Sequence, residues 1–313
     1  MRIYRSVEEI EYNANRIITV GSFDGVHRGH KEIIRRLTSQ AQEEKLSSML
    51  VTFEPHPQLV INNPNKPQIK ILTDVDEKIE ILSTLNIDEL LIVNFTDEFS
   101  QTSPEEYVRD FIFGKIGVKK VIMGYDHLFG KARSGDFNLL MNLAIDLNFK
   151  LERVPALEGD NIIISSSNIR EMISSNRLEE ANYMLGYTYF VVGTVVEGNK
   201  LGRTIGFPTA NIQLNNPNKL LPKNGVYLVN VLIGTEKFWG MANIGKRPTV
   251  SNDNKEILEV NIFDLNRDIY GEEIKISFYR FIRNEQKFPD VSSLKAQLER
   301  DRINCHNLEK MFY

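Results

Sequence analysis

The feature that most constrains the fold is a change of pattern near residue 185. Up to about residue 155, strand-like stretches alternate with helix-like ones, whereas from about residue 187 strand-like stretches follow one another without a long helix between them. Alternation is typical of a doubly wound α/β parallel sheet, and consecutive strands indicate an antiparallel sheet or small β-barrel. We therefore predict two domains of unlike architecture, residues 1–185 and 186–313.

The expected elements follow from hydrophobic periodicity. In the first domain we expect strands at 16–21, 48–53, 89–95, 119–124 and 149–154, and helices at 29–43, 74–84, 103–113 and 135–146. In the second we expect strands at 188–197, 225–234, 237–243, 256–264 and 273–283, then a terminal helix at about 291–303. Doubly wound sheets bind ligands beyond the carboxyl ends of their strands, so the loops that follow the strands are the candidate binding segments.

Composition limits the class of protein. The 313 residues are 42% hydrophobic and 26% charged, which is ordinary for a soluble globular protein. A net charge of −4 argues against nucleic-acid binding by bulk positive charge. The single cysteine, Cys305, excludes an internal disulfide, and neither a signal peptide nor a membrane-length apolar run is visible. We expect a cytoplasmic protein without nucleic-acid or membrane partners, and the sequence leaves open whether it forms a homo-oligomer.

The densest signal in the first domain is residues 21–30, Gly-Ser-Phe-Asp-Gly-Val-His-Arg-Gly-His, which lie between a strand-like and a helix-like stretch. A strand, a Gly-bearing turn and a helix start aim backbone N–H groups and the helix dipole at a phosphate. His27 and His30 lie one turn apart, so both rings can face one anion. The run lacks the Gly-x-Gly-x-x-Gly of dinucleotide sites and the Gly-Lys-Ser/Thr of a Walker A loop. Chemistry on a nucleoside triphosphate is therefore favoured over hydride transfer or P-loop hydrolysis.

A later segment, residues 164–170, is a Ser-rich helix start that ends in an arginine. Ser166 or Ser167 can cap the helix, and Arg170 on its first turn suits a polyphosphate. The His-Arg-Gly-His run resembles the His-x-Gly-His signature of the nucleotidyltransferase superfamily, and residues 164–170 resemble that superfamily's second signature.

Two further segments narrow the resemblance. Residues 124–136, which contain Gly-Tyr-Asp-His-Leu-Phe-Gly, and residues 53–57, Phe-Glu-Pro-His-Pro, resemble the FMN adenylyltransferase module of bacterial bifunctional riboflavin kinase/FAD synthetases. The resemblance implies catalytic roles for His27 and His30. It also implies ATP contacts from Gly21, Phe23, Asp24, Gly29, Ser166, Ser167 and Arg170, and flavin contacts from Pro55, His56, Pro57, Asp126 and Phe129.

The second domain opens with a Gly-rich basic run at residues 198–212. Such a loop can wrap a phosphate with backbone N–H groups and with Lys200 or Arg203, and Thr209 and Asn211 offer hard oxygens to Mg²⁺. The run resembles the riboflavin kinase signature, in which Gly-Phe-Pro-Thr-Ala-Asn is nearly diagnostic. The resemblance implies ATP contacts from Gly198, Lys200, Gly202, Arg203, Gly206, Phe207 and Pro208, metal contacts from Thr209 and Asn211, and a flavin contact from Arg283.

The predicted strand at 256–264 carries a carboxylate on one face. Leu258, Val260 and Ile262 share one face, whereas Glu259 and Asn261 share the other. The family commonly has Glu-Thr-His here, and this chain has Glu-Val-Asn. The resemblance implies that Glu259 is the catalytic base and leaves the effect of Asn261 open.

The resemblance covers nearly the whole chain and implies a bifunctional transferase. With ATP and Mg²⁺, riboflavin would be phosphorylated to FMN, and a second ATP would adenylylate FMN to FAD with release of pyrophosphate. One alternative is that only the kinase works and the N-terminal module is a degenerate nucleotide-binding regulator, but both nucleotidyltransferase signatures are intact. The other is a flavin-binding store or sensor, which would need no loop for Mg²⁺ and ATP.

Overall fold

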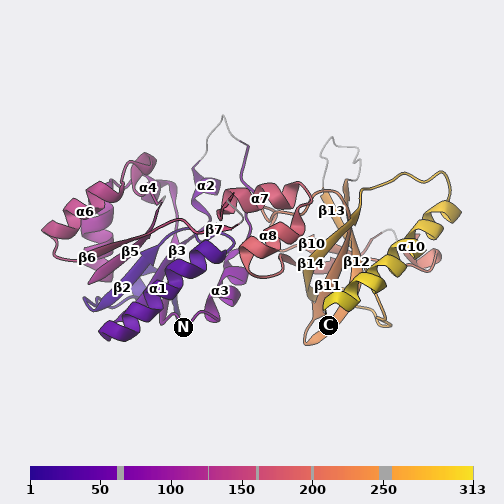
Figure 1. Ribbon diagram of the computed structural model, residues 1–313, viewed down its shortest axis with the longest axis horizontal. Coiled ribbons are helices and arrows are strands. Elements are labelled where there is room, and N and C mark those ends of the chain that lie inside the picture. Colours follow the sequence, from indigo (N-terminus) through magenta and orange to yellow (C-terminus); the bar gives the residue numbers. More distant parts are fainter. Residues whose placement is uncertain (62–66, 126, 160–161, 199–200, 247–255, 313) are drawn as a thin grey trace. The chain divides into compact units, whose positions relative to one another are not determined.

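The computed structural model describes residues 1–61, 67–125, 127–159, 162–198, 201–246 and 256–312. The chain forms two compact units, Met1–Ser166 and Ser167–Tyr313 (Figure 1). Each unit is built around its own sheet. The domain boundary at 185/186 stays a prediction; helices α7 (Ser166–Ser174) and α8 (Leu178–Leu185) belong, apart from Ser166, to the second compact unit.

The first unit contains a six-stranded sheet in the order β1-β4-β3-β2-β5-β6, in which every neighbouring pair is parallel. Its strands are β1 (Arg2–Tyr4), β2 (Arg16–Val20), β3 (Ser47–Glu54), β4 (Glu89–Asn94), β5 (Lys120–Gly124) and β6 (Lys150–Val154). The central strands are nearly continuous runs of buried residues, as expected of a parallel sheet that is covered on both faces.

Helices cover both faces of this sheet (Figure 1). On one face, α1 (Arg28–Glu44) and α3 (Val75–Ser83) pack over a core that contains Leu50. On the other, η2 (Tyr107–Ile116) and α6 (Phe137–Asp146) pack over a core that contains Val51. Successive residues of a strand point to opposite faces, so this division follows directly from the strand geometry. The remaining short elements are η1 (Val7–Glu9), α2 (Pro57–Val60), α4 (Asp97–Ser100), α5 (Pro104–Glu106), η3 (Lys131–Arg133), β7 (Glu158–Gly159) and β8 (Ile162–Ile163).

The strand order determines where a ligand would bind. From β2 the chain adds β3 and β4 on one side, and it later adds β5 and β6 on the other. The strand order therefore reverses between β2 and β5, and doubly wound sheets bind ligands at this point, outside the carboxyl ends of the strands. The loops after Val20 and Gly124 flank it.

The second unit is a closed antiparallel barrel in the order β10-β13-β12-β11-β14-β9, which the pairing of β9 with β10 closes. Its strands are β9 (Phe190–Val196), β10 (Ala210–Leu214), β11 (Gly225–Ile233), β12 (Glu236–Lys246), β13 (Glu256–Ile262) and β14 (Glu273–Arg283). Leu258, Val260 and Ile262 lie buried on one face of β13, as the sequence pattern predicts.

The terminal helix packs against the outside of the barrel. Cys305 of α10 (Val291–Glu309) is buried in an apolar cluster with Met241, Phe263 and Phe207. Short elements in this unit are α9 (Leu201–Thr204) and η4 (Lys310–Phe312). None of the described helices has the length and apolarity that crossing a bilayer requires.

The predicted architecture, a doubly wound parallel sheet followed by an antiparallel barrel with a terminal helix, is confirmed. Among the described residues, one strand of the six-stranded sheet and one strand of the barrel were not predicted, and neither was the two-stranded pair β7-β8. β1 has only three residues and exists through its pairing with β4. β10 follows a Gly- and Pro-bearing loop, and its role is visible only in the closed sheet, where it lies between β9 and β13.

Candidate active sites

The loop after β2 has an unusual backbone. Phe23 and Val26 have φ of 46° and 35°, and Gly25 has φ of 81°. This left-handed region is unfavourable for residues with a side chain, most of all for a β-branched one, by about 1–3 kcal/mol each. Burial of Phe23 and Val26 against Ile34 offsets that cost. The loop is therefore fixed in one conformation at the point where the strand order reverses.

Asp24 determines the shape of this loop. Its carboxylate, 1% exposed, accepts hydrogen bonds from the backbone N–H groups of Leu72 at 2.9 Å and Thr73 at 3.0 Å. In return the Thr73 hydroxyl accepts from the N–H of Gly25 at 2.9 Å. The Asp24 carboxylate thus ties the loop to the segment before α3, and its predicted contact with ATP stays a prediction.

His27 and His30 form a stacked pair at the start of α1. Their ring centroids lie 3.6 Å apart with 17° between the planes, and His27 Nδ1 accepts from the N–H of His30 at 3.3 Å, which caps the helix. Nδ1 of His30 is buried without a hydrogen-bond partner among the described residues. Burial, His27 and Lys78 hold the pKa of His30 well below its usual value. His30 is therefore a neutral imidazole with one ring nitrogen available to a ligand.

The structure brings residues 164–166, the first part of the second predicted signature, to the loop after β2. Ser166 Oγ donates to the backbone carbonyl of Asp24 at 2.8 Å. A Cβ on Gly29 would lie 3.1 Å from ring atoms of His27 and 3.4 Å from the carbonyl oxygen of Ile164, so a larger residue here would crowd the His27 ring. Segments about 140 residues apart thus meet at one loop. Ser167 and Arg170 belong to the second compact unit, and their role at this site stays a prediction.

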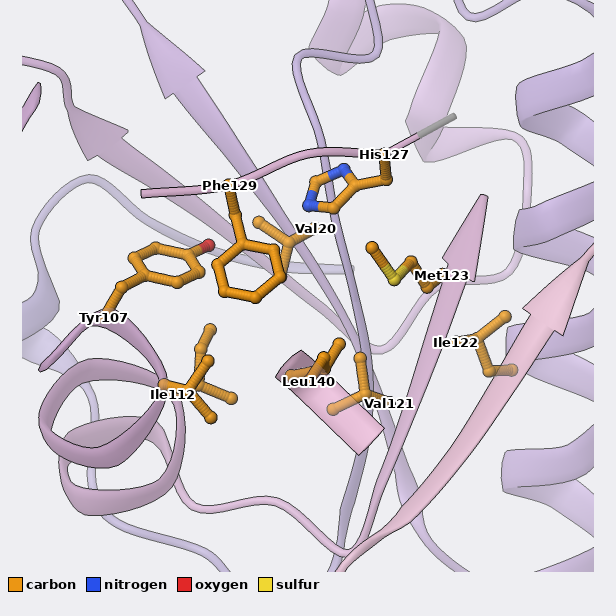
Figure 2. Close-up of a pocket in the computed structure, with 10 residues that line it drawn as sticks. Val20, Tyr107, Ile112, Val121, Ile122, Met123, His127, Phe129 and Leu140 are labelled. Atoms are coloured by element: carbon orange, nitrogen blue, oxygen red, sulfur yellow. The ribbon is translucent and has the colours of Figure 1, made fainter. Parts of the chain in front are cut away.

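A small pocket opens among the residues near the end of β5 (Figure 2). Its lining is apolar and aromatic apart from His127 and the Tyr107 hydroxyl: Val20, Tyr107, Val108, Ile112, Val121, Ile122, Met123, His127, Phe129 and Leu140. Burial and the charge of Arg133 lower the pKa of His127 to about 4, so this ring is neutral at pH 7. The volume of about 20 Å³ holds one water molecule, so a flavin ring would have to displace side chains here.

The predicted flavin contacts lie in two places. Phe129 lies in this pocket, where its ring centroid is 5.7 Å from that of Tyr107. Pro55, His56 and Pro57 follow β3, where His56 Nδ1 accepts from the N–H of Gln58 and caps α2. Asp126 lies outside the described residues.

Sequence reasoning missed Lys78, a lysine only 3% exposed that contacts the loop after β2. Its Nζ donates to the carbonyl oxygen of Ser22 at 2.8 Å and to Thr52 Oγ1 at 3.2 Å. A signal was present, because Lys78 precedes the buried Leu82 by four residues and so shares the apolar face of α3.

In the barrel, strand register brings polar side chains into one row. Asn211 of β10 lies opposite Glu259 of β13, and Glu259 lies opposite Asn243 of β12. Paired residues on neighbouring antiparallel strands share a face, with Cβ atoms about 4.5–5.5 Å apart. The predicted base and one predicted metal contact therefore lie side by side on the outer face of the barrel.

The Gly-rich loop is fitted closely to this row. A Cβ on Gly198 would collide with the Asn211 amide, and one on Gly202 would collide with the carbonyl oxygen of Phe207 and lie 3.5 Å from Thr209 Oγ1. The N–H of Phe207 donates to the carbonyl of Gly202 at 2.8 Å. Gly206, with φ of 84°, makes the turn that this bond closes. Lys200 and the side chain of Arg203 lie outside the described part of the chain.

Asn261 joins the loop to the barrel. Its side chain is 7% exposed, and Nδ2 donates to the carbonyl oxygen of Pro208 at 2.6 Å, one residue before Thr209. An amide thus fills the position that the family commonly gives to histidine.

Arg283, the predicted flavin contact of the kinase, forms an ion pair with a buried carboxylate. Its Nε and Nη2 donate to Asp301 of α10 at 2.9 and 2.7 Å, and Asp301 is 3% exposed. Gln297 donates to the same carboxylate at 2.8 Å. The ion pair fixes Arg283 against α10, and its contact with a flavin stays a prediction.

We expect Asn261→Asp to make kinase activity dependent on pH. An ionised carboxylate cannot donate to the Pro208 carbonyl and repels it, whereas a protonated one can donate. Burial and that carbonyl both favour the protonated acid, so the ratio of variant to wild-type rate should rise as pH falls. Riboflavin phosphorylation from pH 5.5 to 8.5 measures this ratio; a constant ratio would show that the hydrogen bond has no bearing on turnover.

Comparison with protein families gives two matches that cover most of the chain. Residues 9–168 match the family described as FAD synthetase, and residues 185–308 match the family described as riboflavin kinase. Among curated relatives named bifunctional riboflavin kinase/FMN adenylyltransferase, one from Listeria monocytogenes is 42% identical over 92% of this chain and 90% of its own. A second such relative, from Escherichia coli strain K12, is 36% identical over 92% of this chain and 91% of its own.

A solved structure has the same fold over the whole chain. It is titled a macrolide-efflux protein from Streptococcus pneumoniae, covers 97% of this chain and 98% of its own, and superposes with a TM-score of 0.87 at 31% identity. The matches confirm the family predicted from the sequence and the two activities that define it. The chain belongs to the bifunctional riboflavin kinase/FMN adenylyltransferase family.

Proposed function

We propose that the barrel phosphorylates riboflavin at the row formed by Asn211, Glu259 and Asn243. Glu259 accepts the proton of the riboflavin 5′-hydroxyl. The hydroxyl oxygen attacks the γ-phosphorus of ATP, and ADP leaves. The loop from Gly198 to Gly206 covers the phosphates with backbone N–H groups. Catalysis is then mostly positioning and charge neutralisation. The observation that carries this proposal is the register of Glu259 opposite Asn211.

Mg²⁺ fits the same row, because the Thr209 hydroxyl and the Asn211 amide provide the hard oxygens that this ion prefers. When bound, the ion would neutralise phosphate charge. We expect excess EDTA to stop FMN formation by the wild type and added Mg²⁺ to restore it, measured as flavins separated by chromatography. FMN formation that continues in EDTA would contradict the assignment of Thr209 and Asn211.

In the first unit, the proposed reaction is adenylylation of FMN. An oxygen of the FMN phosphate attacks the α-phosphorus of ATP, and pyrophosphate leaves; the nucleophile is already an anion, so no covalent enzyme intermediate is needed. His27 and His30 stabilise the charge of the transition state. Ser166, Ser167 and Arg170 hold the β- and γ-phosphates, and Phe129 contacts the flavin. The observation that carries this proposal is the neutral imidazole of His30, whose buried Nδ1 has no hydrogen-bond partner among the described residues.

One assay separates this function from its alternatives. Purified protein is incubated with riboflavin, ATP and Mg²⁺, and riboflavin, FMN and FAD are resolved over time. We expect FMN to appear first and FAD to follow. FMN alone would favour a degenerate N-terminal module, and bound but unconverted riboflavin would favour a flavin store. ATP and flavin substrates are consistent with the cytoplasmic location that we propose.

A further inference from the structure

Lys78 is a buried cation that neither proposed mechanism uses. It extends from α3 beneath the loop after β2 and is 3% exposed. Its Nζ and the hydroxyl of Thr52 both donate to the carbonyl oxygen of Ser22, at 2.8 and 3.1 Å. Burial of an ammonium group is costly unless it is paired and hydrogen-bonded. Two hydrogen bonds to neutral oxygens are weak compensation for a structural lysine, so its presence under this loop needs a reason.

Carboxylates from three elements favour the charged form of Lys78. Asp24 lies in the loop after β2, Glu54 ends β3, and Asp74 caps α3; all three charges oppose the burial that lowers the pKa of Lys78. An ammonium group has three N–H donors, and two of them are used by Ser22 and Thr52. Burial lowers the pKa of Lys78, and the three carboxylates and two hydrogen bonds favour its charged form against that burial.

The hydrogen bond from Lys78 to the Ser22 carbonyl determines the direction in which the following N–H, that of Phe23, points. The Ser22–Phe23 peptide is trans, and in a trans peptide the C=O and the following N–H point in opposite directions. Because the Ser22 carbonyl points to Lys78, the N–H of Phe23 points away from it. Among the described residues this N–H has no hydrogen-bond acceptor, although Phe23 is 2% exposed. Backbone N–H groups in protein interiors are almost always paired, so the Phe23 N–H is a donor that the described residues leave for another partner.

We propose that Lys78 is a positioning residue of the adenylyltransferase site, where it holds the Ser22 carbonyl so that the Phe23 N–H is presented to a phosphate oxygen of the nucleoside triphosphate. Its positive charge behind the same peptide strengthens that donor for an anion. The proposal rests on the proposed function of the loop as the phosphate site. It adds one backbone donor and one buried cation to that site.

The test compares Lys78→Gln and Lys78→Met with Lys119→Gln, which changes an exposed lysine of the same unit. Supplied FMN and varied ATP isolate adenylylation from the kinase reaction. We expect the Lys78 variants to lose about 10- to 100-fold in kcat/KM for ATP, less than the about 10²–10³-fold that loss of a preorganised donor itself costs, because the Phe23 N–H remains in place. KM for FMN should change little, and Lys119→Gln should match the wild type. Riboflavin phosphorylation by the same chains and the melting temperature show whether the variants are folded.

The pH profile provides a readout that a purely structural role would not change. Burial lowers the pKa of His30, and so do the charged or titratable groups that act on it among the described residues, His27 on its own helix and Lys78 on α3. Removal of the Lys78 charge therefore raises the pKa of His30. The acidic limb of adenylylation should move to higher pH in Lys78→Gln and should not move in Lys119→Gln.

Three outcomes decide between the proposals. Wild-type kcat/KM for ATP in Lys78→Gln would overturn the role of Lys78, and so would an equal loss of the kinase reaction in both Lys78 variants, because the residue would then serve folding alone. A wild-type chain that forms no FAD from FMN and ATP would instead overturn the proposed function of the site.

Discussion

His30→Ala is expected to stop flavin conversion at FMN. The substitution removes the neutral imidazole whose Nδ1 is buried without a partner among the described residues, and with it a stabiliser of charge in the adenylyl transfer. Loss of one preorganised donor lowers kcat by about 10²–10³-fold in comparable sites. The measurement is FAD formation from supplied FMN and ATP, with FMN formation from riboflavin recorded on the same preparation.

The histidine pair allows structure and chemistry to be separated. His27 also caps α1, so His27→Ala would remove a helix cap together with the ring. His27→Asn keeps an acceptor of the kind that caps helices, and we expect it to lose FAD formation while its melting temperature stays near that of the wild type. If His30→Ala and His27→Asn both form FAD at the wild-type rate, the pair has no catalytic role.

Glu259→Gln is expected to abolish conversion of riboflavin to FMN while supplied FMN still becomes FAD. The amide keeps the shape of the side chain opposite Asn211 but cannot accept a proton from the 5′-hydroxyl. General-base catalysis contributes about 10²–10⁴-fold, so the kinase rate should fall by that factor. The measurement is the initial rate of FMN formation at saturating ATP.

Glu256→Gln is the matched control for that variant, because Glu256 is an exposed carboxylate at the start of the same strand. It should retain the wild-type kinase rate. Equal losses in both variants would point to the strand's charge or folding instead of a base at position 259. A wild-type rate in Glu259→Gln would assign the proton to another acceptor.

The local pattern of apolar residues was sufficient to predict most of the fold. The period of the apolar residues predicted five of the parallel strands and the helices between them, since each element buries its own apolar face. Three-residue β1 and the short β10 were missed because such strands are stabilised by their neighbours and carry no periodic signal of their own.

The local sequence pattern also predicted candidate residues for both sites, but not the contacts that arrange them. The His pair and the Gly-rich loop were visible because the residues lie close together in the sequence. Lys78 and the link from Asn261 to Pro208 were not, because burial and a hydrogen-bond partner more than 50 residues away depend on how the strands and helices meet.

The sequence by itself determined the two architectures, the family and the residue types at each site, because these depend on local periodicity and on contiguous motifs. Only the tertiary structure decided that Ser166 meets Asp24, that Glu259 lies opposite Asn211, and that Lys78 is buried under the loop after β2. These facts depend on strand order and register. Both are selected by the burial of whole faces against one another, a property that no single segment contains.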